Sequence, residues 1–145
     1  MVPSGGFFDF APLPPWAVAR GLDHAALYVD SLVLPVAVDP EAGRAFLDAV
    51  RTLRAAFGAG LHLTGGLSNV SYGLPARRLL NDVFIDLAIA AGADSGIIDP
   101  LANDPRRIAE FDRGSRPYRL ASDLLAGADP YGGEFLGAFR AGELA

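Results

Sequence analysis

The stretch "LHLTGGLSNVSYGLPARRLLNDVFIDLAIAAGADSGIIDP", residues 61–100, determines the fold that we predict for this chain. It opens with a short strand-like segment, 61–66, passes through a polar loop, and then carries apolar residues at helical spacing over 77–92. A second extended run, 93–100, ends in Asp-Pro. This order predicts a strand, a helix closed by Gly92, and another strand. Such alternation is typical of a parallel sheet with right-handed crossover connections.

The same order occurs upstream of this stretch. The segment "AALYVDSLVLPVAV", residues 25–38, is rich in Val, Leu and Tyr and predicts a buried strand that ends at Asp30, followed by an extended loop. The segment "DPEAGRAFLDAVRTLRAAFG", residues 39–58, predicts a helix with Asp39 as its N-cap and Gly58 at its end. The chain is therefore expected to contain three strand–loop–helix units.

The remainder of the chain suggests one domain preceded by an arm. A length of 145 residues with 51% hydrophobic residues is enough for one domain with a buried core. Residues 1–24 read as an irregular arm rich in proline, glycine and aromatic residues, and 25–145 as the domain, closed by helices near 117–127 and 131–140. Four large aromatic residues of the arm are expected to cover apolar surface: Phe7, Phe8, Phe10 and Trp16.

Composition excludes several classes of function. The net charge of −5 argues against nucleic acid as a partner, because a protein that binds the phosphate backbone is expected to be basic. The absence of cysteine excludes disulfides and thiolate chemistry. All twelve basic residues are arginine, which excludes a Walker A loop and Schiff-base chemistry. No apolar run reaches the roughly 18 residues of a membrane span, and the first residues lack the basic start of a secretory signal, so we expect a cytoplasmic protein without a membrane partner.

Polar side chains gather where the predicted strands end, which is where α/β folds bind ligands. These residues are Asp30, Ser68, Asn69 and Asp99. The carboxylate of Asp30 could accept two parallel N–H bonds, and the Asn69 amide offers a donor and an acceptor to the edge of a heterocycle. The alternatives are a loop-capping role for Asp30, a helix-capping turn at Asn69, and a plain strand end at Asp99, which we favour for that residue.

Other catalytic or metal sites are not indicated. His24 and His62 lack the spacing of metal ligands and are expected to be structural or exposed, so no metal site is predicted. The chain has no nucleophile elbow, no Ser-His-Asp signature and no dinucleotide fingerprint. Arg77, at the start of a predicted helix, could bind an anionic tail with help from the helix N-terminus.

Two segments, "LYVDSLVLPVAVD" (27–39) and "GGLSNVSYGLPARRLLNDVFIDLAIAAGADSGIIDPL" (65–101), resemble the pterin-binding methyltransferases. This family comprises the methyltetrahydrofolate:corrinoid methyltransferases and the folate domain of cobalamin-dependent methionine synthase, and it is related to dihydropteroate synthase. The resemblance spans roughly residues 25–142. It implies a (β/α)8 TIM-type barrel, which takes about 250 residues. The 145 residues here would supply the last three βα units, with parallel strands, so 25–145 would be a partial pterin-binding barrel domain.

The resemblance also implies roles for individual residues. Asp30 would hold the pterin ring, Gly66 and Ser68 would contact it through backbone and side chain, and Asn69 would lie near pterin N5 as the catalytic residue. Arg77 matches the arginine at the far end of the pterin loop. The family usually has Asp-Pro-Leu where this chain has Asp30-Ser31-Leu32, a change that keeps the carboxylate.

The implied activity is methyl transfer from a methylated tetrahydrofolate or tetrahydropterin to a cobalamin or other corrinoid carried by a partner protein. Because three strands cannot close a barrel, we expect self-association or a separate chain that supplies the missing strands, unless the arm covers the open face. The alternatives are a non-catalytic pterin- or folate-binding remnant and a truncated fragment stabilised only by assembly.

Overall fold

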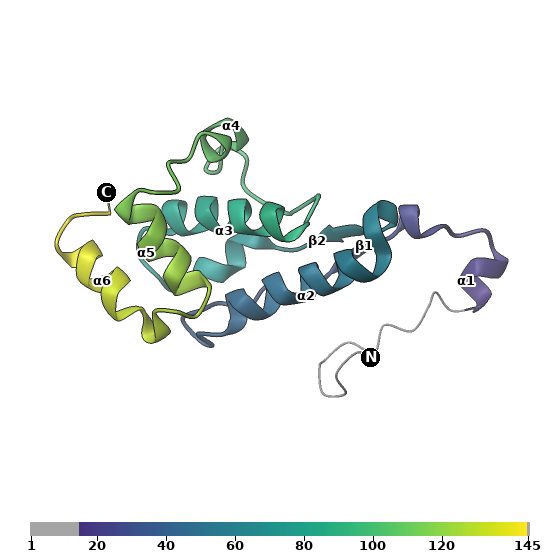
Figure 1. Ribbon diagram of the computed structural model, residues 1–145, viewed down its shortest axis with the longest axis horizontal. Coiled ribbons are helices and arrows are strands. Elements are labelled where there is room, and N and C mark those ends of the chain that lie inside the picture. The colour runs from purple at the N-terminus through teal and green to yellow at the C-terminus, as the bar shows by residue number, and fades with distance from the viewer. Residues whose placement is uncertain (1–14, 145) are drawn as a thin grey trace.

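The computed structural model describes residues 15–144, so the predictions for Phe7, Phe8 and Phe10 lie outside the described residues. The chain is an α/β protein with few strand residues and many helical ones (Figure 1). Its strands and α-helices are α1 (Pro15–Ala19), β1 (Tyr28–Asp30), α2 (Ala42–Phe57), β2 (His62–Thr64), α3 (Arg77–Ala91), α4 (Pro105–Ala109), α5 (Arg116–Leu125) and α6 (Gly133–Arg140). Short 3-10 turns occur at η1 (His24–Ala26), η2 (Gly58–Gly60), η3 (Leu67–Ser71) and η4 (Pro130–Gly132).

The sheet of the described residues consists of β1 and β2, which pair in parallel with Tyr28 opposite His62 and Asp30 opposite Thr64. Helix α2 forms the crossover between them, as the sequence predicts for consecutive parallel strands. The α/β class and the parallel pairing are therefore confirmed.

The prediction of a third strand over 93–100 is wrong. In this segment the structure has one isolated parallel bridge, between Gly66 and Ile97. The reason lies at its start, where the Asp94 carboxylate accepts the backbone N–H of Leu63 at 3.0 Å. A side chain thus takes the place that a backbone carbonyl would hold in a continuous ladder.

The prediction that β1 is buried is also wrong. Tyr28 is 63% exposed, and along β1 the residues alternate between exposed and half-buried. Val29 packs against the core, whereas Tyr28 and Asp30 point to the opposite face, as the two-residue period of a strand requires. The helices thus cover one face of the sheet only, among the residues described.

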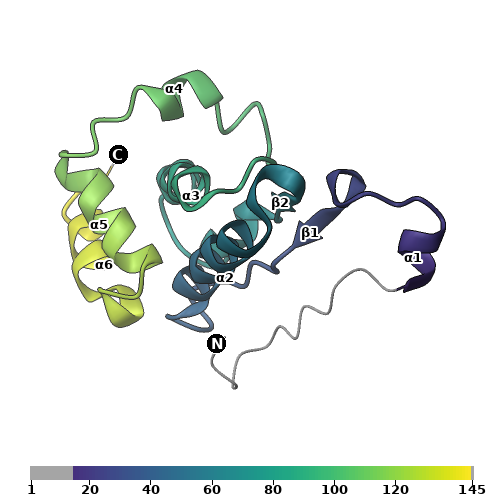
Figure 2. The ribbon, with the colours of Figure 1, turned by 45° about the vertical axis from the view of Figure 1, so that its right-hand side comes forward.

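Helix α3 lies at the centre of the helical side, between α2 and α5, with α6 beyond α5 (Figure 2). Its apolar face is buried against α5 and α2, and on the α2 side the Phe46 and Phe84 rings lie 5.5 Å apart. The largest fully buried apolar side chains are Phe46, Phe84, Phe135, Leu63, Leu80, Leu125, Val50, Val70 and Val83. This core holds the strand ends in place from one side.

The helix boundaries follow the predicted signals with one correction. Gly92 closes α3 in the left-handed conformation and Gly58 caps α2, as expected. Asp39 is not the N-cap of α2: its carboxylate accepts the Glu41 N–H at 3.0 Å, which makes a separate turn before the helix begins at Ala42.

The closing helices α5 and α6 confirm the two helices predicted near 117–127 and 131–140. Helix α4 was not predicted, although its start carries a readable signal. Asp104 caps it by accepting the Arg106 N–H at 2.9 Å, and Pro105 follows at the first helical position.

Helix α1 falls within the predicted arm and lies away from the helices α2 to α6 (Figures 1 and 2). The Trp16 side chain is 59% exposed. In the part of the chain that the structure describes, no helix is long and apolar enough to cross a membrane.

Candidate functional site at the strand ends

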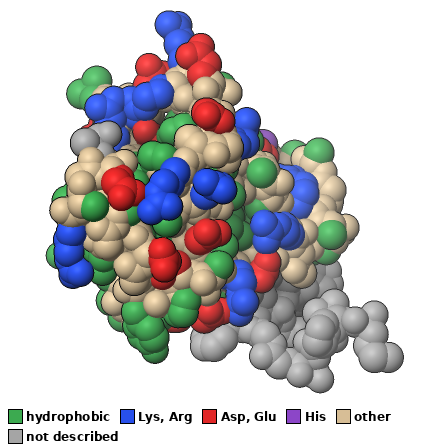
Figure 3. Space-filling model, turned by 60° about the vertical axis from the view of Figure 1, so that its left-hand side comes forward, with side chains coloured by type: hydrophobic (Ala, Val, Ile, Leu, Met, Phe, Trp, Pro, Cys, Tyr) green, Lys and Arg blue, Asp and Glu red, His purple; other side chains and the backbone are tan. Residues whose placement is uncertain are grey.

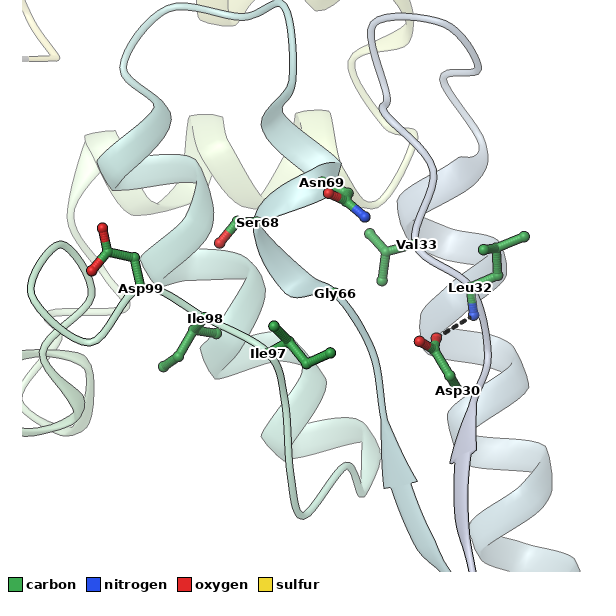
Figure 4. Close-up of a pocket in the computed structure, with 9 residues that line it drawn as sticks. All are labelled: Asp30, Leu32, Val33, Gly66, Ser68, Asn69, Ile97, Ile98 and Asp99. Atoms are coloured by element: carbon green, nitrogen blue, oxygen red, sulfur yellow. Dashed lines mark hydrogen bonds between the residues drawn. The ribbon is translucent and has the colours of Figure 1, made fainter.

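An open cavity of about 490 Å³ lies at the carboxyl ends of β1 and β2 (Figure 4). This volume falls within the range of small-molecule sites. The cavity is lined by Asp30, Leu32, Val33, Gly66, Ser68, Asn69, Ile97, Ile98 and Asp99. Four of the five residues predicted for the site therefore meet on one cavity, although they come from two separate strand–loop units.

Asp30 is positioned by a tight turn at the end of β1. One carboxylate oxygen accepts the Leu32 N–H at 2.8 Å, and Leu32 adopts a left-handed backbone with φ 59° (Figure 4). A non-glycine residue in this region is strained, and such strain tends to be kept where a site requires it. The second carboxylate oxygen makes no hydrogen bond within the described residues, so Asp30 both caps its loop and keeps an acceptor for a ligand.

Ser68 and Asn69 lie on η3, the turn that follows β2. The Asn69 N–H bonds to the Gly66 carbonyl at 3.0 Å. A Cβ on Gly66 would lie only 3.0 Å from Asn69 Nδ2, so glycine is needed here for the amide to occupy its place. The helix-capping alternative for Asn69 is wrong, because Ala76 is the N-cap of α3 and no side chain caps that helix.

Arg77 is the one predicted site residue that does not line the cavity. Its Nε donates to Ser71 Oγ and its Nη2 to the Ser68 carbonyl, both at 3.1 Å. Its guanidinium carbon lies 5.9 Å from the centre of the Tyr72 ring. The guanidinium is therefore engaged within the 66–77 loop itself.

Asp99 lies on the far side of Ile97 and Ile98 from Asp30 (Figure 4). One oxygen accepts the Leu101 N–H at 2.9 Å, so it ends its segment with a turn, as favoured from the sequence, and also lines the cavity. Sequence reasoning missed the apolar walls formed by Val33, Ile97 and Ile98. A usable signal was present, because each lies beside a strand end that carries a polar site residue.

The cavity lining carries two carboxylates and no cationic side chain. Such a lining favours ligands that present hydrogen-bond donors, including ring N–H and exocyclic amine groups. Its two amide-or-hydroxyl residues, Asn69 and Ser68, are neutral and can both donate and accept. The chemistry of the lining is therefore recognition and orientation rather than nucleophilic attack.

The other polar clusters of the described residues serve the fold. His62 Nδ1 lies 3.0 Å from Asp94 Oδ2, and the His62 ring stacks on Tyr28 at 4.5 Å. The pKa of Asp94 is lowered: burial alone would raise it, but the Leu63 N–H, His62 and Arg54 outweigh that effect. Within residues 15–144, no three His, Asp or Glu side chains form a group that could hold a metal ion.

Two aspartates of α3 bind arginines on its outer side. Asp82 accepts hydrogen bonds from Arg107 and from Asn103, the latter at 2.7 Å. Asp86 accepts from Arg113 at 2.9 and 2.6 Å and from the Tyr118 hydroxyl at 2.7 Å. On the surface that Figure 3 shows, basic and acidic side chains are intermixed, so this face carries no basic patch.

Burial raises the pKa of Asp86, yet the bonds and charge of Arg113 and the Tyr118 hydroxyl more than reverse this, so the net shift is downward. Burial, followed by the Asp86 carboxylate, raises the pKa of Tyr118 to about 12. These shifted groups lie on the helical side and not on the cavity.

Comparison with known proteins supports the resemblance found in the sequence. No family model matches the chain. A methylcorrinoid:tetrahydrofolate methyltransferase from Eubacterium limosum is 30% identical over 128 residues, which are 88% of this chain and 43% of that protein. Methionine synthase from Mycobacterium tuberculosis is 34% identical over 122 residues, 72% of this chain and 10% of that protein.

Methionine synthase from Mycobacterium leprae is 38% identical over 84 residues, covering 54% of this chain and 7% of that protein. The chain thus spans less than half the length of the first of these relatives and a tenth or less of the other two. These matches confirm the predicted relationship, over part of the length of the relatives.

Proposed function

We propose, from the premise that this chain is related to part of the pterin-binding methyltransferases, that its strand-end cavity binds the pterin ring of a methylated tetrahydrofolate and presents it for methyl transfer to a corrinoid. One observation carries the proposal: Asp30, Gly66, Ser68 and Asn69 meet on a single open cavity. The name of one relative, a methylcorrinoid:tetrahydrofolate methyltransferase, contains the same two partners of the transfer, a tetrahydrofolate and a corrinoid.

The lining supplies what a pterin requires. The free oxygen of Asp30 would accept a ring N–H or the exocyclic amine, and the apolar side chains of Val33 and Ile97 would contact the flat faces of the ring. The lack of a lining cation suits a ligand part that offers donors rather than negative charge.

In the proposed reaction, the corrinoid of a partner protein supplies the nucleophile that takes the methyl group. The carbon–nitrogen bond at N5 breaks, its electron pair stays on N5, and an amine of this kind leaves poorly without help. Asn69 would donate a hydrogen bond from its amide to N5 that strengthens as the electron pair develops, which stabilises the transition state more than the ground state.

The incomplete sheet motivates the partner part of the proposal. The relatives are longer than this chain, and the β1 face that carries Tyr28 is exposed in the described residues. We propose that this chain works as the last units of a (β/α)8 barrel, with the other strands supplied by a second copy or a separate chain. Cytoplasmic location remains a prediction.

The proposal is tested by calorimetric titration of methyltetrahydrofolate into the chain, into Asn69→Ala and into Thr52→Ala, an exposed α2 position, as control. We expect saturable binding that Asn69→Ala weakens by about tenfold, or 1.4 kcal/mol, and that Thr52→Ala leaves unchanged. Equal affinity of all three variants, or no binding at millimolar ligand, would contradict the pterin assignment.

A non-catalytic binding module is the second candidate, because the cavity lining carries groups suited to recognition and no group suited to nucleophilic attack. Transfer of the methyl group from methyltetrahydrofolate to reduced free cobalamin separates the two. Binding with methylation of cobalamin supports the enzyme, whereas binding without it, also in the presence of a corrinoid protein, supports the binding module.

A further inference from the structure

The placement of Asn69 depends on the backbone that carries it. Its side chain makes no hydrogen bond to any residue that the structure describes. Its backbone N–H bonds to the Gly66 carbonyl at 3.0 Å, and its carbonyl accepts the Tyr72 N–H at 3.1 Å. Whatever holds the η3 turn therefore sets the direction of the Asn69 amide.

A buried hydroxyl lies under this turn. Ser71 is fully buried, and its Oγ donates to Asn81 Oδ1 at 2.6 Å while it accepts from Arg77 Nε at 3.1 Å. One donor and one acceptor of the hydroxyl are thus used. Asn81 is 7% exposed and projects from α3, whose apolar face is part of the core. The turn is therefore tied to α3, a helix with nine buried residues.

Arg77 makes two hydrogen bonds to the η3 turn. Besides Ser71 Oγ, it binds the Ser68 carbonyl through Nη2 at 3.1 Å, and its guanidinium approaches the Tyr72 ring. A planar guanidinium suits such a forked contact, which a lysine ammonium cannot reproduce. Arg77 does not line the cavity, so its positive charge is not part of the cavity wall.

We propose that Asn81, Ser71 and Arg77 form a positioning network that holds the η3 turn, and with it Ser68 and Asn69, in the geometry that the pterin requires. The proposal rests on the proposed function for its ligand. Ser71 and Asn81 are buried, so the loss of either one leaves the other as a desolvated polar group, whereas Arg77 is exposed and binds the turn from the solvent side. Arg77 is then a positioning residue rather than the anchor of an anionic tail.

Two probes separate these roles. Methyltetrahydrofolate carries an anionic glutamyl tail, and 6-methyltetrahydropterin has the ring without the tail. We expect Ser71→Ala and Arg77→Gln to weaken both ligands by the same factor, about tenfold. Arg77→Lys should behave like Arg77→Gln, since it keeps the charge but not the fork. Arg78→Gln, the neighbouring exposed arginine, is the matched control and should change neither affinity.

The proposal is overturned if the loss is confined to the ligand with the tail and Arg77→Lys restores it, because charge alone would then explain the effect. It is also overturned if neither Ser71→Ala nor Arg77→Gln alters binding of the ligand without the tail.

Amide hydrogen exchange of the ligand-free chain gives a readout that does not depend on the pterin. Ser71→Ala should speed exchange at Asn69 and Tyr72, the amides that bond within the turn, and leave α5 unchanged. Unchanged exchange in the turn, or an equal rise throughout the chain, contradicts a positioning role. If the wild-type chain binds neither probe, the proposed function fails, and the exchange result still decides whether the network holds the turn.

Discussion

The aspartates of the helical side and those of the strand ends face opposite requirements. On α3, Asp86 uses both carboxylate oxygens on Arg113 and Tyr118, and it is 7% exposed. At the end of β1, one carboxylate oxygen of Asp30 accepts a hydrogen bond from its own loop, and the side chain lines an open cavity. The difference indicates that a buried carboxylate with both oxygens hydrogen-bonded, which we call saturated, stabilises the fold. A carboxylate at a strand end with one oxygen still without a hydrogen bond can bind a ligand.

The largest expected effect tests the close packing of α2 against α5 on the helical side. In Gly43→Ala, the new Cβ would lie 2.1 Å from the Leu125 carbonyl oxygen, a backbone atom that cannot rotate away. The backbones of α2 and α5 must then separate, so we expect a loss of about 3 kcal/mol of unfolding free energy or no folded chain at all. Denaturant unfolding followed by circular dichroism measures this.

Gly137→Ala is the matched control for Gly43→Ala, because nothing lies within 4 Å of the added Cβ on α6. It should be neutral or stabilise the chain by up to about 1 kcal/mol, since alanine favours a helix over glycine. Similar losses in the two variants would show that close approach of α2 and α5 is not the cause.

The second effect tests the saturated carboxylate. Asp86→Asn removes the charge that pairs with Arg113, and we expect a loss of about 2 kcal/mol at neutral pH. The pKa of Asp86 is lowered from the model-compound value of 3.8 in the folded chain, so its contribution is present above that value and is lost as pH falls below it. The difference between wild type and Asp86→Asn should therefore shrink in acid urea titrations.

A difference between wild type and Asp86→Asn that stays constant from pH 7 down to pH 3 would show that the charge of Asp86 contributes nothing. Asp48→Asn is a suitable control, because the Asp48 side chain is 60% exposed and its pairing with Arg51 is solvated. This control should change the unfolding free energy by no more than about 0.5 kcal/mol.

The third effect concerns the cavity and is smaller. Gly66→Ala places a Cβ 3.0 Å from Asn69 Nδ2, so the amide must move by a few tenths of an ångström. We expect about fivefold weaker binding of methyltetrahydrofolate, near 1 kcal/mol, with little change in melting temperature. Titration and thermal unfolding of the same sample measure both quantities, and an unchanged affinity would argue against Asn69 as a ligand contact.

The smallest effect is expected at a solvated ion pair. Arg51 and Asp48 pair at 2.7 Å on α2, with both side chains more than half exposed. Arg51→Ala should cost no more than about 0.5 kcal/mol, because solvent screens the charges in both states. If thermal or urea unfolding showed that Arg51→Ala lowered the unfolding free energy by 2 kcal/mol or more, the exposed Arg51–Asp48 pair would contribute as much as the buried carboxylate of Asp86, and the comparison would fail.

The sequence predicted most of what local chemistry decides. Gly92 and Gly58 mark the ends of α3 and α2 because these positions need a positive φ that glycine adopts freely. The meeting of Asp30 with Asn69 followed from strand ends alone, since parallel strands bring their carboxyl ends to one edge.

The errors came from tertiary contacts that no local pattern encodes. Asp94 was predicted to lie in a strand. Its side-chain carboxylate, rather than a backbone carbonyl, accepts the Leu63 N–H, so the backbone ladder does not form there. Asp39 looked like a helix cap, but it closes a turn of its own. Arg77 stays a prediction as a ligand contact: its guanidinium donates to the Ser71 hydroxyl and the Ser68 carbonyl, and it does not line the cavity.

The cavity is shared between two chain units that the sheet joins by only three residue pairs, Tyr28 to Asp30 on one side and His62 to Thr64 on the other. A pterin bound to Asp30 and to Asn69 at once would therefore act as a brace between β1 and the η3 turn. Binding to the folded state alone adds RT ln(1 + [L]/Kd), so each tenfold rise in ligand above Kd adds about 1.4 kcal/mol to the unfolding free energy. For so short a strand pair, the proposed substrate would then also serve as part of the framework that holds its own site together.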